Sequence, residues 1–229
     1  MNIHPQPIPL PSIRAVAFDL DGLIFNTEDL YEIVGVELLR RRGKEMSAEL
    51  LAQMLGRRAR TALQMMIEAH NLTDSVKQLE RETDEIFLGL LDGHLKTMPG
   101  VNELMEALEE ARIPKSIATS SRREYVENIL GRFKFIERFD FILSAEDVSH
   151  GKPDPEIYQV SAQRHQVACC DLMVLEDSPN GCQAGVKAGC FTVAVPTRHS
   201  QDHVFPTTNL RVESLMDRRL YGALGLALD

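Results

Sequence analysis

Hydrophobic and polar positions divide the chain into a short apolar run, a long helical region and a later alternation. The run IRAVAF at 13–18 is largely apolar and lacks a helical period, which predicts a buried β-strand. Residues 27–92 instead carry helical patterns such as LYEIVGVELLRRRG and ARTALQMMIEAH, with few β-branched runs. We therefore expect one strand followed by a block of helices.

Beyond TMPG at 97–100, amphipathic segments alternate with short apolar runs. The amphipathic segments predict helices and the apolar runs predict strands. Strands that alternate with helices are typical of a parallel, doubly wound sheet covered on both faces, so the sequence predicts an α/β fold. The helices are expected at 101–113, 123–133, 154–165 and 178–189, and the strands at 115–121, 139–145, 171–177 and 190–196.

Two of these helices have recognisable boundary residues. Asp154 is a candidate N-cap with Pro155 in the first turn, and Ser178 is a candidate N-cap before Pro179. Gly189 stands where the second helix should end. Glycine recurs every four residues along this last helix, which indicates a face packed closely on the sheet.

Composition and charge narrow the classes of partner. The chain has 229 residues, of which 44% are hydrophobic, and this suits one sizeable domain or a core domain with a smaller insert. A formal net charge of −9 argues against a nucleic-acid partner, since such proteins usually present a basic face. No apolar run approaches the ~20 residues of a membrane helix. The proline-rich start MNIHPQPIPLPS lacks the features of a signal peptide and is expected to be a loose or docked tail.

The four cysteines, Cys169, Cys170, Cys182 and Cys190, form no CxxC pair. We expect reduced, mostly buried thiols rather than disulfides or a zinc site, as is usual in the cytoplasm. The sequence therefore predicts a cytoplasmic protein.

Polar side chains come at the ends of the predicted strands. Asp19 and Asp21 follow the first strand, Thr119 follows a later one, and Glu176 and Asp177 end another. Ligands of such sheets lie outside the carboxyl ends of the strands, where these side chains converge if their strands are neighbours. Carboxylates at one point repel one another unless a cation lies among them. Oxygen ligands without His or Cys suit Mg²⁺.

Other interpretations of these segments fit less well. An isolated DLDG is most often a solvated turn. A Ca²⁺ loop would need oxygen ligands or glycine where Leu23, Ile24 and Leu30 stand, and a P-loop would need Ser or Thr after Lys152, where Pro153 stands. A metal ion, a lysine and the hydroxyl of a threonine can instead hold the oxygens of a phosphoryl group in transfer.

The segments DLDGLIFNTE, IATSS, HGKPDP and LEDSPNG, in this order and spacing, resemble the four motifs of the haloacid dehalogenase (HAD) superfamily. More narrowly, they resemble its phosphatase and phosphomutase branch, which carries a helical cap between the first and second motifs. The resemblance implies a Rossmann-like core of residues 1–26 and 94–229 and a cap of residues 27–93.

The resemblance also implies roles for the residues of the first and third motifs. Asp19 is similar to the nucleophile that becomes an aspartyl-phosphate, and Asp21 to the general acid and base, which also lends its backbone carbonyl to Mg²⁺. Lys152 is similar to the lysine that orients the phosphate and holds Asp19 in place. Members that cleave carbon–halogen bonds lack the second Asp, so its presence favours phosphate esters.

The second and fourth motifs supply the other implied roles. Thr119 is similar to the hydroxyl that orients the phosphate together with Lys152. Ser120 stands where some relatives carry an amide, and it is a further candidate phosphate contact. Asp177 is similar to the direct Mg²⁺ ligand, and Glu176 to a neighbour that often acts through water.

The cap region holds the candidates for substrate choice. Arg57, Arg58 and Arg60 in GRRAR are placed to meet a second anionic group or to lie solvated at a helix start, and Arg58 is taken as a candidate substrate contact. Tyr31 stands where the sugar phosphomutases usually carry a histidine, which favours hydrolysis.

The predicted function is Mg²⁺-dependent hydrolysis of a small phosphorylated metabolite through an aspartyl-phosphate. Sugar phosphates and nucleoside monophosphates, including pseudouridine 5′-phosphate, are the expected substrate classes, with phosphoglycolate and 2-deoxyglucose 6-phosphate as further candidates. A β-phosphoglucomutase-like mutase and a non-catalytic phosphate-binding protein are the alternatives. We expect a monomer or weak dimer without nucleic-acid or membrane partners.

Overall fold

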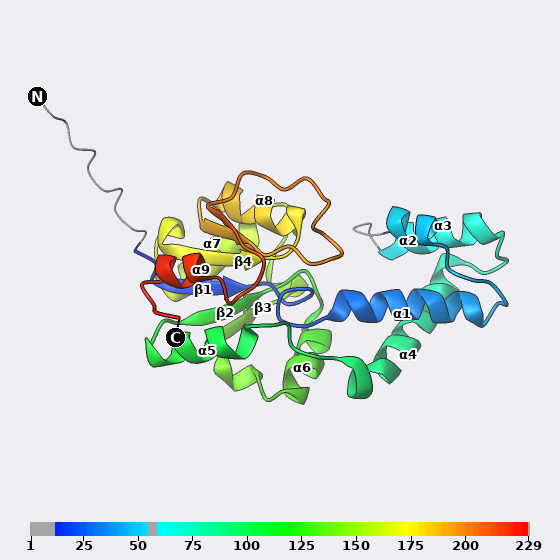
Figure 1. Cartoon of the computed structure of the whole chain (residues 1–229), viewed down its shortest axis with the longest axis horizontal. Coiled ribbons are helices and arrows are strands. Elements are labelled where there is room, and N and C mark those ends of the chain that lie inside the picture. The colour runs from blue at the N-terminus through cyan, green and yellow to red at the C-terminus, as the bar shows by residue number, and fades with distance from the viewer. Residues whose placement is uncertain (1–11, 55–58, 229) are drawn as a thin grey trace, which may run out of the picture. The chain divides into compact units, whose positions relative to one another are not determined.

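The structure is a computed structural model that describes residues 12–54 and 59–228. The chain divides into two compact units (Figure 1). Of the described residues, the first unit contains those up to Leu20, Pro99–Pro196 and those from Val204 onward. The second unit contains Asp21–Met98 and Thr197–His203.

A six-stranded sheet forms the centre of the first unit. Its strand order is β3-β2-β1-β4-β5-β6, and every neighbouring pair is parallel. This confirms the predicted α/β class with a doubly wound parallel sheet. The strands are β1 (Ala15–Phe18), β2 (Lys115–Ala118), β3 (Phe141–Leu143), β4 (Leu172–Glu176), β5 (Phe191–Ala194) and β6 (Leu210–Arg211).

Helices cover both faces of this sheet. Figure 1 shows α7 and α8 on one face and α5 and α6 on the other, the arrangement that parallel crossovers require. No helix in the described part of the chain is both long and apolar enough to cross a membrane. The helices are α5 (Val101–Glu110), α6 (Arg123–Arg132), α7 (Glu156–His165), α8 (Pro179–Ala188) and α9 (Arg218–Ala223), with 3₁₀ turns at Ile136–Arg138, Ala145–Asp147 and Cys169–Asp171.

The local sequence explains where α8 begins and ends and corrects the start of α7. The Ser178 side chain caps α8 by accepting a hydrogen bond from Gly181 N at 3.1 Å, and Gly189 follows the helix with φ +77°, as expected. α7 begins at Glu156, one residue later than a cap at Asp154 requires. Asp154 Oδ1 still accepts the hydrogen bond of Glu156 N at 3.0 Å, so its capping effect is retained.

Within its described residues, the second unit contains four helices and a short segment from near the end of the chain. Tyr31 of α1 stacks on Phe87 of α4, with ring centroids 4.6 Å apart, and Ser75 caps α4. The helical block predicted over 27–92 is thus confirmed within the described residues. The helices are α1 (Thr27–Arg40), α2 (Ala48–Met54), α3 (Ala59–His70) and α4 (Val76–His94).

The returning segment, Thr197–His203, follows β5 in sequence but belongs to the second unit. Arg198 forms ion pairs of 2.8 Å with Asp29 and with Glu32 on the first turns of α1. His199 lies 2.7 Å from Asp29, measured from Nε2 to Oδ1. The cap boundaries drawn from sequence, 27–93, remain a prediction, and this segment was not part of them.

Candidate active site

The predicted strand ends meet at one edge of the sheet. Asp19 follows β1, the strand that lies between β2 and β4. Thr119 follows β2, and Glu176 and Asp177 end and follow β4. Because these three strands are adjacent and parallel, their carboxyl ends bring the four side chains to the same place.

Lys152 links these strands through its ammonium group. Its Nζ donates hydrogen bonds to Asp19 Oδ1 at 2.5 Å, to Glu176 Oε1 at 2.6 Å and to the carbonyl oxygen of Ala118 at 2.8 Å. An ammonium has three N–H donors, and each has an acceptor here. The side chain is 6% exposed, so this cation is held in a fixed direction within the site.

Two opposing effects act on the charge of Lys152. Burial by itself would lower the pKa of the ammonium, but the carboxylates of Asp19 and Glu176 outweigh burial and raise the pKa above its usual value. Lys152 therefore stays protonated over the whole physiological range. It serves as a fixed positive charge and not as a base.

Three carboxylates lie close enough together to need a balancing positive charge. Asp19, Glu176 and Asp177 each offer an oxygen, and these oxygens all lie within 4.8 Å of one another. The residues are 7%, 0% and 3% exposed, and buried carboxylates this close together require positive charge between them. Lys152 supplies one such charge, and an all-oxygen donor set suits Mg²⁺ as the other.

The surroundings of Glu176 contain candidate site residues that the sequence did not predict. Tyr158 on α7 is fully buried and donates its hydroxyl to Glu176 Oε1 at 2.7 Å. Ser178, predicted only as a helix cap, donates its hydroxyl to Glu176 Oε2 at 2.9 Å. Gly181 faces the same carboxylate so closely that a Cβ there would overlap it. In the sequence, the one feature that pointed to Tyr158 was its position six residues after Lys152.

The other predicted site residues differ in what the structure shows of them. Thr119 is buried, and its Oγ1 accepts a hydrogen bond from Ser121 N at 3.1 Å, which leaves its own hydrogen to donate. Ser120 is exposed beside it. Asp21 is the first residue of the second unit and forms an isolated β-bridge with Phe25. Its role as general acid and base stays a prediction. Arg58 lies outside the described residues.

Arg60, one of the three predicted arginines, and Glu28 on α1 are both described by the structure. Arg60 forms an exposed 2.7 Å ion pair with Glu80, so its charge is already partnered within the second unit. Glu28 is largely buried, and burial raises the pKa of its carboxyl although Thr197 donates a 2.9 Å hydrogen bond to it. All four cysteines are free thiols; Cys182 and Cys190 are buried as predicted, whereas Cys169 is partly exposed and Cys170 is exposed.

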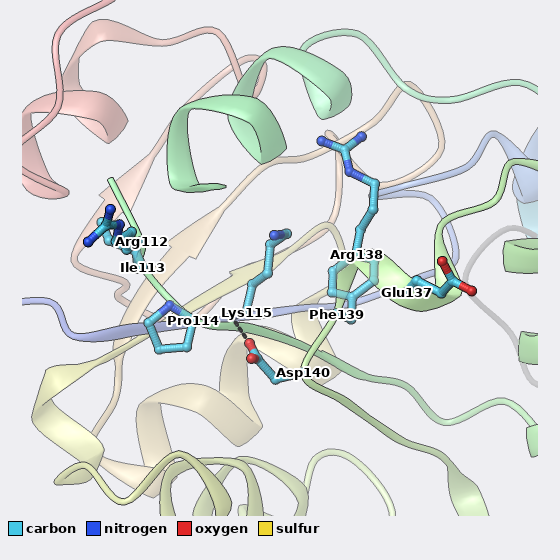
Figure 2. Close-up of a pocket in the computed structure, with 8 residues that line it drawn as sticks. All are labelled: Arg112, Ile113, Pro114, Lys115, Glu137, Arg138, Phe139 and Asp140. Carbon is cyan, nitrogen blue, oxygen red and sulfur yellow. Dashed lines mark hydrogen bonds between the residues drawn. The ribbon is translucent and has the colours of Figure 1, made fainter. Parts of the chain in front are cut away.

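A pocket of about 350 Å³ lies at the opposite edge of the sheet, where β2 and β3 begin. Figure 2 shows Lys115 and Arg138 pointing to the same side of it, while Asp140 accepts the hydrogen bond of the Lys115 backbone. Both cations already pair with Glu109, at 2.9 Å and 2.8 Å. These two cations therefore share one carboxylate of the protein, and Arg112 and Glu137 also line the pocket.

The family model for haloacid dehalogenase-like hydrolases matches residues 16–195. The chain belongs to this family. The matched region begins in β1 and ends just after β5, so it includes Asp19, Lys152 and the end of β4. The family predicted from the four motifs is confirmed.

Curated relatives with related enzymatic names cover most of the chain. A phosphorylated carbohydrates phosphatase of Thermotoga maritima is 33% identical over 178 residues, 77% of this chain and 82% of that protein. A protein of Drosophila melanogaster named as a pseudouridine-5′-phosphatase is 32% identical over 217 residues, 91% of this chain and 92% of its own. The predicted enzyme class, a phosphatase of the HAD family, is confirmed.

A further relative is longer than this chain. The bifunctional riboflavin kinase/FMN phosphatase of Arabidopsis thaliana is 30% identical over 206 residues, and the chain spans 90% of its own length but 54% of that protein. Among solved structures, one from Thermotoga maritima described as a β-phosphoglucomutase is 27% identical with a TM-score of 0.76, covering 93% of this chain and 97% of that one.

Proposed function

We propose that this phosphatase hydrolyses a small phosphorylated metabolite through an aspartyl-phosphate on Asp19, with Mg²⁺ as cofactor. The observation that carries the proposal is the buried contact of Lys152 with Asp19 at the edge where Asp177 and Thr119 also lie. A carboxylate oriented by a permanent cation is a suitable nucleophile for phosphorus, and the same cation attracts the phosphate.

The side chains would divide the work as follows. Lys152 fixes Asp19 through Oδ1 and attracts the phosphoryl group by its positive charge, while the Thr119 hydroxyl offers a hydrogen-bond donor to a phosphoryl oxygen. Asp21, two residues after Asp19, would protonate the leaving oxygen and later take a proton from water. Mg²⁺ would be held by Asp19 and Asp177, with Glu176 beside them, and when bound it neutralises charge on the transferring group.

Metal dependence provides the first test of this proposal. We expect EDTA to abolish hydrolysis of p-nitrophenyl phosphate and Mg²⁺ to restore it. Replacing Asp177 with asparagine removes one anionic oxygen from the site and should raise the half-saturating Mg²⁺ concentration by about tenfold or more. The measurement is initial rate against free Mg²⁺.

The matched control for this test is Asp171→Asn, because Asp171 lies just before β4, at the other end of the same strand. Its half-saturating Mg²⁺ concentration should equal that of the wild type. Turnover that survives EDTA, or equal effects of the two variants, would reject the metal site.

The named activities of the relatives indicate a substrate class. The relatives act by name on phosphorylated carbohydrates, pseudouridine 5′-phosphate and FMN, which all carry a phosphate monoester on a sugar-like or polyol carbon. We expect the best substrate in a panel of about 100 phosphorylated metabolites to come from this chemical class. Arg58 remains a candidate contact for such a substrate, and Arg58→Ala should then raise KM more than it lowers kcat.

A phosphomutase is the second candidate, favoured by the similarity to the β-phosphoglucomutase structure. Tyr31, at the position where mutases carry histidine, is half exposed and stacked on Phe87. We expect phosphate release to exceed isomerisation when the protein is incubated with β-glucose 1-phosphate and its bisphosphate. Isomerisation is monitored by the coupled oxidation of glucose 6-phosphate. If it is faster than phosphate release, the protein is a mutase instead.

A further inference from the structure

The Glu176 carboxylate is fully occupied by donors of the protein itself. Its Oε1 accepts hydrogen bonds from Lys152 Nζ at 2.6 Å and from the Tyr158 hydroxyl at 2.7 Å. Its Oε2 accepts from the Ser178 hydroxyl at 2.9 Å and from Ser178 N at 3.3 Å. A carboxylate has about four lone-pair positions, and four donors take them here. A direct bond from Glu176 to a metal ion would displace one of these donors.

Tyr158 contacts both members of the Glu176–Lys152 pair. Besides its hydrogen bond to Glu176, its ring lies 5.1 Å from Lys152 Nζ, within range of a cation–π interaction. Burial, followed by the charges of Glu176 and Asp19, raises the pKa of its hydroxyl well above the usual value, so the hydroxyl stays a donor. Glu176 and Tyr158 are both fully buried, so water cannot replace this hydrogen bond.

We propose that Tyr158 is a positioning residue that holds Glu176 as the anchor of Lys152. The inference rests on the proposed function and deepens it. With the Tyr158 hydroxyl in place, the carboxylate is fixed from both sides and the ammonium keeps its direction toward Asp19. Without it, one acceptor position of Glu176 is empty, and the carboxylate and Lys152 can both turn.

The test compares Tyr158→Phe with Tyr221→Phe. Tyr221 is a matched control, because it is buried on α9 and its hydroxyl has no hydrogen-bond partner among the described residues. Four quantities are measured for both variants and the wild type: kcat and KM for p-nitrophenyl phosphate, the Mg²⁺ dissociation constant by calorimetry without substrate, and the dissociation constant of inorganic phosphate.

For Tyr158→Phe we expect kcat/KM to fall by about tenfold and the phosphate dissociation constant to rise, because a hydrogen bond to a buried charge is lost. The Mg²⁺ dissociation constant should stay within about threefold of the wild type. Tyr221→Phe should change none of these. All assays are run well below the melting temperatures of both variants, so that a loss of thermal stability does not change the measured values.

Two results would overturn the proposal. Equal kinetics and phosphate binding in the two variants would show that the Tyr158 hydroxyl does not position Lys152. A tenfold rise in the Mg²⁺ dissociation constant would show that the Tyr158 hydroxyl supports the metal site through Glu176 instead of positioning Lys152. Wild-type protein that hydrolyses no ester would count against the proposed function, while the phosphate and Mg²⁺ titrations would still decide the role of Tyr158.

Discussion

Replacing Asp19 with asparagine is expected to lower kcat for phosphate-ester hydrolysis by about a thousandfold or more. The amide is nearly the same size as the carboxylate, so packing around β1 is retained. It cannot attack phosphorus as an anion, and it offers Lys152 a neutral acceptor in place of a charged one. Steady-state kinetics at saturating Mg²⁺ give the change in kcat. In addition, acid quenching should no longer trap a radiolabelled phosphoryl group from the substrate on the protein.

The control for this variant is a measurement of its thermal stability. Asp19→Asn still leaves Lys152 bonded to Glu176 and Ala118, so the melting temperature should change little. An Asp19→Asn protein with turnover near that of the wild type, after mass spectrometry has excluded reversion of the amide, would show that another residue is the nucleophile.

Replacing Gly181 with alanine is expected to have the second-largest effect. The added Cβ would overlap the Glu176 carboxylate, which is held by Lys152, Tyr158 and Ser178 and cannot move aside without losing them. Overpacking of this kind costs about 2 kcal/mol, or about 5 °C in melting temperature for a chain of this size. Displacing Glu176 also turns Lys152, so kcat/KM should fall by about a hundredfold.

The same substitution at Gly222 provides a matched comparison. Gly222 lies in α9, and a Cβ added there would meet nothing within 4 Å among the described residues. Gly222→Ala should therefore raise stability slightly through helix propensity and leave kinetics unchanged. If Gly181→Ala behaved like Gly222→Ala in both calorimetry and kinetics, the Glu176 carboxylate would be able to move away from the added Cβ at no cost. Its role as a fixed anchor would then be wrong.

Most of the first unit could be predicted because its signals are local. The apolar run that forms β1 ends at Asp19, and Ser178, Pro179 and Gly189 bound α8 through their own backbone preferences. The convergence of Asp19 with Asp177 also followed from sequence, once the alternation of elements indicated a parallel sheet. Lys152 was found through the family motif, since no local pattern distinguishes it from a solvated lysine.

The residues that were missed act through contacts over long sequence separations. Tyr158 stands among the buried positions Ile157, Ser161 and Ala162 of α7, so its pattern is that of a core aromatic. Its partner Glu176 is 18 residues away on another element. The strand β6 has two residues, too few for any periodic signal. The polar segment TRHSQDH has no apolar period, and the acids that it meets on α1 are about 170 residues distant.

That last contact has a practical consequence for exchanging caps between relatives. The polypeptide passes between the two units four times, not twice, because Thr197–His203 joins the inserted helices. A chimera that transplants only the 21–98 insertion would separate Glu28, Asp29 and Glu32 from Thr197, Arg198 and His199. Successful grafts should therefore carry both pieces, with splice points also placed on either side of the 197–203 stretch.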